Sequence, residues 1–141
     1  MKKTVLALLL ALLAPVLAHA AGTVVLTSTD SVIGQSVKIY TYTLTADAAD
    51  GTFPATASDP IDGWIIRVET NPGATAPTAL WDLTLVSDGL DVMNGVLANR
   101  SASATEHVLA PQPYVRGPVT ITATNNAVNS AVIVLKITVL R

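Results

Sequence analysis

The sequence predicts an all-β fold, an antiparallel two-sheet β-sandwich of about six to eight strands. Segments rich in Val, Ile, Thr and Tyr, which favour strands, are separated by turn residues along most of the chain. Within several segments apolar and polar residues alternate, the pattern of strands with one buried and one wet face. No segment after residue 20 has the 3.6-residue apolar period of an amphipathic helix, so a parallel α/β sheet is not expected.

Six segments have strong strand character, and two are weaker candidates. The six are residues 23–29, 36–45, 63–70, 80–86, 118–124 and 131–140. The weaker pair is 90–93 and 105–109. All eight segments are short, and no linker divides them into two groups. They therefore predict the strands of one domain.

Alternation assigns faces to three of these strands. Trp64, Ile66 and Val68 are predicted to face the core, with Arg67 and Glu69 on the opposite side. Two further strands give equally regular buried rows: Trp81, Leu83 and Leu85, then Ile133, Leu135, Ile137 and Val139. One buried face on each strand is typical of an antiparallel sheet.

The connectors carry turn chemistry. Four turn dipeptides lie between strands: Asp50-Gly51, Asp62-Gly63, Asp88-Gly89 and Asn94-Gly95. Asn71-Pro72-Gly73 is predicted to end one strand, and Ala110-Pro111-Gln112-Pro113 to be extended but outside any ladder. The pattern fits an immunoglobulin-like or a jelly-roll sandwich equally, with a single domain over residues 21–141.

The first twenty residues are typical of a secretory signal peptide. Lys2 and Lys3 precede an apolar run over residues 4–14, Pro15 ends it, and Ala18-His19-Ala20 is a small-x-small cleavage signal. The run is shorter than the roughly 20 residues needed to span a bilayer. We therefore expect an exported protein that is periplasmic or extracellular. The cell surface and a virion are the more specific candidate locations.

Composition excludes several classes of function. Without Lys2 and Lys3 the chain has six basic and ten acidic residues, a net charge of −4, and the basic residues are scattered. Nucleic acid is therefore not an expected partner. The chain has no cysteine, which excludes disulfides, thiolate metal sites and cysteine nucleophiles.

Few residues are candidates for catalysis. His107 is the only histidine after residue 20, and it is predicted to lie on the surface or on an edge strand. No hydrolase elbow, zinc-protease or nucleotide-binding motif is present. Paired carboxylates alone can hydrolyse glycosides, but the acidic residues lie mostly in turns. An enzyme is therefore not expected. An exported hydrolase ranks third among the functional hypotheses, after a structural protein and a ligand-binding module.

Acidic connectors raise a calcium hypothesis, because carboxylate and carbonyl oxygens are the ligands that calcium prefers. The candidate ligands are Asp47, Asp50, Asp59, Asp62, Asp88 and Asp91. Neither group of loops matches an EF-hand, and turn formation explains the same residues. No other cofactor is expected.

The aromatic residues have two interpretations. Exposed rings can stack on sugars, so Trp64 and Trp81 raise the hypothesis of a carbohydrate platform. Both share a face with aliphatic residues, so packing in the core is the favoured interpretation. Tyr40 and Tyr42 lie on a segment with apolar residues on both faces, which predicts a central strand or one covered by another subunit.

Low charge and long strands favour contact with other proteins. Half of the chain is hydrophobic and 13% is charged. Exported β-domains can assemble by exchanging strands. The feature that would indicate strand exchange is a mobile segment 23–29 that does not pair within its own domain.

Three stretches carry a family resemblance: GWIIRVETNPGATAPTALWDLTL (63–85), DVMNGVLANRS (91–101) and GPVTITATNNAVNSAVIVLKI (117–137). Their order resembles small uncharacterised β-rich proteins encoded with the structural genes of tailed phages and prophages. The shared motifs are turns and strands, so the resemblance implies a structural role in a virion or on a surface and transfers no site. A signal peptide departs from that family's pattern.

The resulting prediction is a non-enzymatic exported β-sandwich that works as a structural, surface or adhesion component through protein–protein contacts or self-association. The alternative is a secreted module that binds calcium or carbohydrate.

Overall fold

The computed structural model describes residues 20–32, 34, 36–109 and 111–141. These residues form ten β-strands and no helix, so none of them belongs to a helix long and apolar enough to cross a membrane. The all-β fold class is confirmed. Residues 1–19 of the predicted signal peptide, and Ala110 of the predicted extended connector, lie outside the described part.

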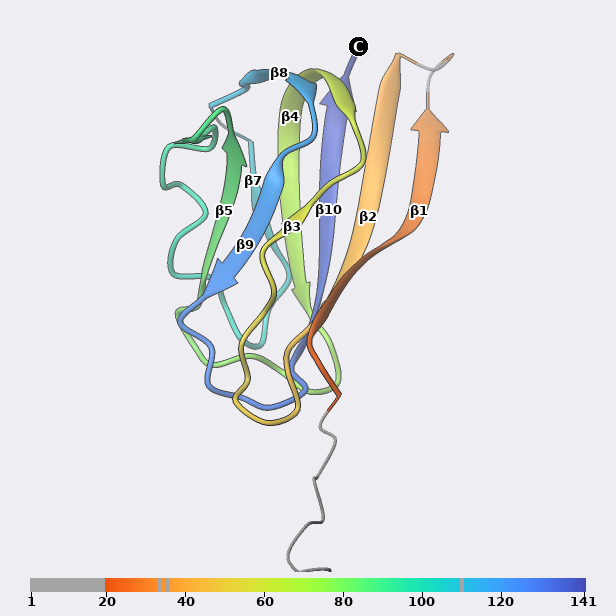
Figure 1. Ribbon diagram of the computed structural model, residues 1–141. Helices are drawn as coiled ribbons and strands as arrows, with labels where there is room; N and C mark the ends of the chain where they lie inside the picture. Colours follow the sequence, from red (N-terminus) through yellow and green to blue (C-terminus); the bar gives the residue numbers. More distant parts are fainter. Residues whose placement is uncertain (1–19, 33, 35, 110) are drawn as a thin grey trace, which may run out of the picture.

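Two antiparallel sheets face each other (Figure 1). The larger sheet has the order β1-β2-β10-β4-β7, and β8 pairs with β4 on the side where β7 also pairs. Its strands are β1 (Thr23–Val32), β2 (Val37–Thr45), β4 (Ile61–Pro72), β7 (Glu106–Val108), β8 (Tyr114–Gly117) and β10 (Val132–Leu140). The smaller sheet has the order β3-β9-β5-β6, from β3 (Thr56–Ala57), β5 (Asp82–Ser87), β6 (Leu90–Asp91) and β9 (Thr120–Thr124).

The core lies between the two sheets and contains residues from both. On β10 and β5 the predicted rows are confirmed. Leu83 and Leu85 are buried, and so are alternate residues of β10: Ile133, Leu135, Ile137 and Val139. Trp81 is fully buried just before β5, and its indole nitrogen donates to the Ser101 carbonyl at 3.2 Å. Strand β2 lies between β1 and β10, and Tyr40 and Tyr42 point into the core, as a central strand requires.

The face predicted for Trp64 is wrong. Strand β4 contains an irregularity opposite β10: Arg67 faces Thr138 and Ile65 faces Val139, which leaves Ile66 without a partner. An extra residue reverses the alternation on one side of a bulge. Ile65 is therefore buried, whereas Trp64 is 49% exposed and Ile66 is half-buried.

Segment 23–29 does not show the feature that would indicate strand exchange, because it pairs within its own domain. Strand β1 pairs with β2 along its whole length, from Thr23 opposite Thr45 to Val32 opposite Val37, with one bulge between Leu26 and Ser28. Val24 and Leu26 pack against the core. Strand β1 is thus a part of its own domain's sheet.

All eight predicted strand segments contain a strand, and two short strands were missed. Strand β3 has two residues and pairs with β9, and β8 has four residues and pairs with the start of β4. Both are too short to show an alternating pattern. Strand β8 directly follows the Pro-containing connector predicted to lie outside any ladder.

Candidate functional site

An apolar row crosses the outer face of the larger sheet, where β10 ends. Its five members are neighbours in register from strand to strand: Val32, Val37, Leu140, Trp64 and Tyr114. Four of them are 41–53% exposed, and Val37 is half-buried. Five strands spaced by about 4.8 Å make this apolar row roughly 19 Å long. Contiguous exposed apolar surface of this kind marks a contact site more often than isolated exposed residues do.

The apolar row depends on the bulge in β4 and on the glycine beside it. The bulge turns Trp64 outward, next to Leu140. Gly63 has φ +145°, and a Cβ at this position would lie 2.3 Å from the carbonyl oxygen of Leu140. Only glycine lets β4 approach β10 so closely at this point.

Polar groups flank the aromatic end of the apolar row. The rings of Trp64 and Tyr114 meet edge to face with centroids 5.3 Å apart. The Tyr114 hydroxyl donates to Asp62 at 2.9 Å, and this hydrogen bond, with the negative charge of Asp62, raises the pKa of Tyr114. Asp62, Gly63, Tyr114 and Arg141 line a shallow hollow of about 270 Å³. The end of the sheet therefore offers aromatic rings, a carboxylate and a guanidinium together.

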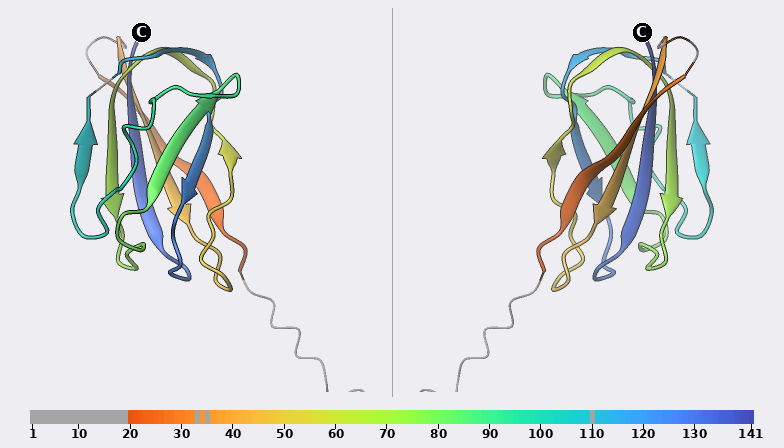
Figure 2. Two further views of the ribbon diagram at one scale, coloured as in Figure 1. Left: turned by 90° about the vertical axis from the view of Figure 1, so that its left-hand side faces the viewer. Right: turned by 90° about the vertical axis from the view of Figure 1, so that its right-hand side faces the viewer.

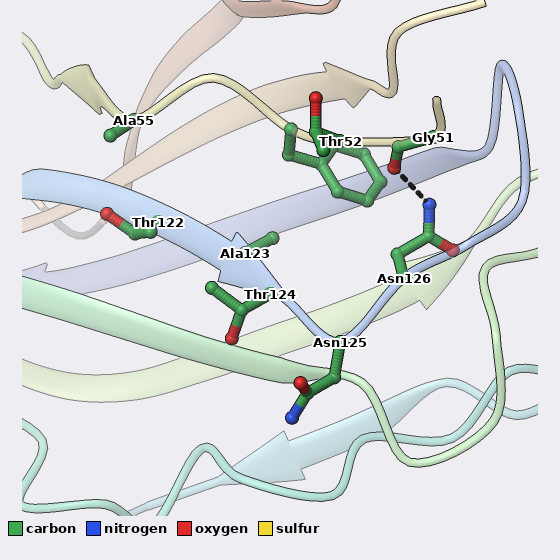
Figure 3. Close-up of a pocket in the computed structure, with 9 residues that line it drawn as sticks. Gly51, Thr52, Ala55, Thr122, Ala123, Thr124, Asn125 and Asn126 are labelled. Atoms are coloured by element: carbon green, nitrogen blue, oxygen red, sulfur yellow. Dashed lines mark hydrogen bonds between the residues drawn. The ribbon is translucent and has the colours of Figure 1, made fainter. Parts of the chain in front are cut away.

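A second hollow, of about 240 Å³, lies at the opposite end of the molecule between the chain before β3 and the end of β9 (Figure 3). Phe53, Ala55 and Ala123 form its apolar part, and hydroxyl and amide groups complete it. Asn126 joins the segments around the hollow by two hydrogen bonds. Its amide nitrogen donates to the Gly51 carbonyl at 2.6 Å, and its amide oxygen accepts from the Thr78 backbone N–H at 2.8 Å. No residue lining this hollow is ionisable, so the hollow has no side chain for acid–base catalysis.

A charged cluster lies on the outer face of the larger sheet. Glu69 on β4 contacts Arg67 at 2.6 Å, Lys136 at 3.1 Å and His107 at 3.3 Å. Burial alone would raise the pKa of the Glu69 carboxyl, but the hydrogen bond and charge of Lys136, with the charges of Arg67 and His107, outweigh it and lower the pKa. His107 lies on the edge strand β7 and is exposed, which agrees with its predicted place. The geometry is that of an ion-pair network that joins three strands.

Replacing Glu69 with glutamine is expected to lower the free energy of unfolding by about 1 kcal/mol at neutral pH. Because the pKa of Glu69 is lower in the folded than in the unfolded protein, its stabilisation is fully present above the unfolded-state value of about 4.3 and is lost as the pH falls through the folded-state pKa. Urea unfolding near pH 7 and near pH 3 measures both regimes. A difference from wild type that stays equal at the two pH values would contradict the charge-based explanation.

The predicted calcium ligands of the first loops are occupied by local contacts. Asp47 accepts the backbone N–H of Ala49 at 2.6 Å, and Asp50 accepts the backbone and hydroxyl groups of Thr52 at 2.9 and 2.7 Å. The two hydrogen bonds from Thr52 lower the pKa of Asp50. These are the contacts of turn-forming aspartates.

The other four candidate aspartates have different surroundings. Asp62 binds the Tyr114 hydroxyl, and the backbone N–H of Asp59 donates to the Tyr42 hydroxyl. Asp88 adopts φ +50° in the turn before β6. The structure brings no three His, Cys, Asp or Glu side chains together as metal ligands within the described ranges.

Asp91 organises the loop after β6. Its carboxylate accepts three backbone N–H groups, from Gly95 at 2.8 Å, Met93 at 3.1 Å and Leu85 at 3.3 Å. One carboxylate therefore joins strand β5 to the turn that carries the buried Met93.

Replacing Asp91 with asparagine is expected to destabilise the protein by about 1–2 kcal/mol, because one acceptor oxygen and the charge are lost. The matched change is Asp88→Asn, in a residue that makes no such contacts with the described part of the chain and whose positive φ suits asparagine. This variant should stay within about 0.5 kcal/mol of wild type. Urea unfolding of the two variants tests the difference. Equal stability of the variants would contradict the role of Asp91.

Sequence reasoning found only part of this region. Trp81 is in the core as predicted, whereas Trp64 lies on the surface with Tyr114, which was not singled out. The interpretation of Asp62-Gly63 as a turn between strands is wrong, because both residues lie within β4. A signal for the bulge was available in the apolar run Trp64-Ile65-Ile66, which breaks the alternation. Nothing in the sequence placed Val32, Val37 and Leu140 beside these aromatic residues.

Comparison of the chain with known proteins gives no match to a family model, to a curated protein or to a solved structure.

Proposed function

We propose that the chain is a non-enzymatic exported module that works through protein–protein contacts at the apolar row. The observation that carries the proposal is the alignment of five apolar side chains across five strands, four of them 41–53% exposed. The supporting fold is a β-sandwich of the jelly-roll kind. Strands β2-β10-β4-β8 in one sheet and β3-β9-β5-β6 in the other have the strand order of two Greek keys.

The chemistry of the apolar row suits a protein partner. Trp, Tyr and Arg are enriched at the centres of protein interfaces, and Trp64, Tyr114 and Arg141 lie together here. Val32, Val37 and Leu140 extend the surface with aliphatic side chains, which add contact area for a flat protein surface. A role in a particle or on a cell surface, which the resemblance to phage-encoded structural proteins implies, is part of this proposal.

The acidic and basic groups support a non-enzymatic role. Glu69 is engaged by the side chains of Arg67, Lys136 and His107, and Asp91 by three backbone N–H groups. His107 contacts Arg67 and Glu69 instead of a nucleophile. Each of these groups has a structural partner, and none lines either of the two hollows described above.

Site-specific photo-crosslinking tests the proposal. A photoreactive phenylalanine analogue at Tyr114 is expected to give discrete crosslinked products in the organism that makes the protein, and Trp64→Ser in the same chain should abolish them. The matched control is the same analogue at Leu90, an apolar residue of β6 that is 72% exposed in the other sheet. Identical crosslinked products from both positions, or crosslinked products that persist in Trp64→Ser, would contradict the proposal.

Carbohydrate binding at the aromatic end of the apolar row is the second candidate. Trp64 and Tyr114 offer ring surface, and Asp62 and Arg141 supply an acceptor and a donor beside it. A glycan array tests this candidate: binding should be lost in Trp64→Ala and reduced in Tyr114→Phe, which keeps the ring but removes the hydroxyl bonded to Asp62. Binding that survives Trp64→Ala would place the sugar elsewhere.

A further inference from the structure

The sheets have edges of very different lengths. In the smaller sheet the edge strands β3 and β6 have two residues each. In the larger sheet one edge consists of β7 and β8, with three and four residues, and the other is β1, with ten. Very short edge strands are one way in which proteins prevent association through unpaired backbone groups. Only the β1 edge lacks this protection among the described strands.

The free side of β1 is open along its length. Figures 1 and 2 show β1 at the margin of the larger sheet, with β2 as its neighbour on one side only. No backbone group of β1 bonds to any other described segment outside the ladder with β2. The strand has no proline, and Asp30 is its single charged residue. A strand of ten residues presents roughly 33 Å of unpaired edge.

The two halves of β1 differ. The second half follows the bulge at Leu26/Ser28 and carries Asp30, and bulges and charges both oppose edge pairing. The first half is regular from Thr23 to Leu26. In that half Val25 is 52% exposed on the outer face, and Val24 and Leu26 are only partly covered by the core.

We propose that the first half of β1 pairs antiparallel with the same strand of a second copy, about a twofold axis at Val25. The stretch Thr23-Val24-Val25-Leu26-Thr27 is nearly symmetric about Val25 in its chemistry. Antiparallel pairing about this axis sets Val25 opposite the partner's Val25 and Val24 opposite the partner's Leu26. Thr23 falls opposite the partner's Thr27, the residue at the bulge, where the regular pairing ends. Apolar residues meet apolar residues and threonines meet threonines, pairs that stabilise antiparallel sheets.

The same register favours a second copy of the chain as the partner that pairs with the edge of β1. A twofold contact requires one surface to complement itself, and this stretch does so at each position. Asp30 lies five positions from the axis, and its counterpart on the partner, position 20, is the last residue of the predicted signal peptide, so the two aspartates do not meet. The two larger sheets then join into one continuous sheet, and the partly exposed Val24 and Leu26 become covered on their free side.

This inference goes beyond the proposed function and is independent of it. Val32, the member of the apolar row on β1, lies seven residues from the axis and beyond the bulge. Each copy therefore keeps its apolar row free, and the dimer presents two of them. Two contact surfaces on one particle raise the effective affinity for a surface with repeated partners.

Analytical ultracentrifugation of the exported protein tests the proposal. The wild type should sediment at twice the chain mass, and Val25→Lys should sediment as a monomer with an unchanged circular dichroism spectrum, because two lysines would meet at the axis. The matched control is Val32→Lys, in the same strand, on the same face and with 44% exposure, which should remain a dimer. A monomeric wild type, a dimeric Val25→Lys or a monomeric Val32→Lys would overturn the proposal. So would a dimer that Trp64→Ala dissociates, since that result assigns self-association to the apolar row.

Disulfide formation in single-cysteine variants is a second and direct test of the register. The chain has no cysteine, so any disulfide in a single-cysteine variant joins two copies. Val25→Cys should oxidise rapidly to a covalent dimer, because residues opposite each other across an antiparallel pair have Cβ atoms about 4.5–5.5 Å apart. Val32→Cys should oxidise slowly. Equal rates for the two variants would contradict the register.

Discussion

Trp81→Ala is expected to lower the free energy of unfolding by about 3–5 kcal/mol, the largest effect of any single truncation in this chain. Trp81 is fully buried, and its indole nitrogen donates to the Ser101 carbonyl, so truncation creates a cavity and leaves an acceptor unpaired. A loss of this size is a large part of the stability of a small domain. Urea unfolding followed by far-ultraviolet circular dichroism measures it.

The chain supplies its own matched control for this prediction. Trp64 is the same residue type but is 49% exposed, and Trp64→Ala should cost less than about 1 kcal/mol. If the two variants lose equal stability, Trp64 is part of the core and the bulge in β4 is wrongly placed. The assignment of the apolar row would then fail as well.

Gly63→Ala is expected to destabilise the protein by about 2–4 kcal/mol. The added Cβ would lie 2.3 Å from the Leu140 carbonyl oxygen, which belongs to a backbone that cannot rotate away, and φ +145° is unfavourable for alanine. The expected result is a separation of the start of β4 from the end of β10, with disorder of the apolar row. Urea unfolding gives the magnitude, and loss of crosslinking at Tyr114 gives the local effect.

Gly117→Ala separates steric clash from backbone strain. Gly117 has φ +119° at the end of β8, but no atom lies within 4 Å of the position that a Cβ would take. Its replacement should cost only the backbone strain, about 1–2 kcal/mol. If Gly63→Ala is no worse than Gly117→Ala, close approach of β4 to β10 does not explain the glycine.

Regular strands could be predicted from the sequence, because their alternation is unbroken. Strand β10 and the Trp81–Leu85 segment bury the residues that a period of two assigns to the core. The pattern also identified β2 as a strand with two apolar faces, which fits its central place. In these elements side-chain period and burial agree, so local sequence is sufficient.

The candidate site could not be predicted in the same way, because it depends on a break in that period. One unpaired residue, Ile66, moves Trp64 from the core to the surface. Strands β3 and β8 are too short to carry a pattern, and β8 brings Tyr114 to Trp64 across a separation of fifty positions. The register among five strands is a tertiary property, so the apolar row is visible only once the chain is folded.

The contrast between the two tryptophans gives the protein an intrinsic optical reporter. Trp81 is sealed from water, so its emission should be blue-shifted and resistant to dissolved quenchers, whereas Trp64 should emit at longer wavelength and be readily quenched. In a Trp81→Phe background the remaining signal would come from the apolar row alone. Occupation of that surface by a partner would then be followed in solution, without an attached label, as a blue shift and a loss of quenching.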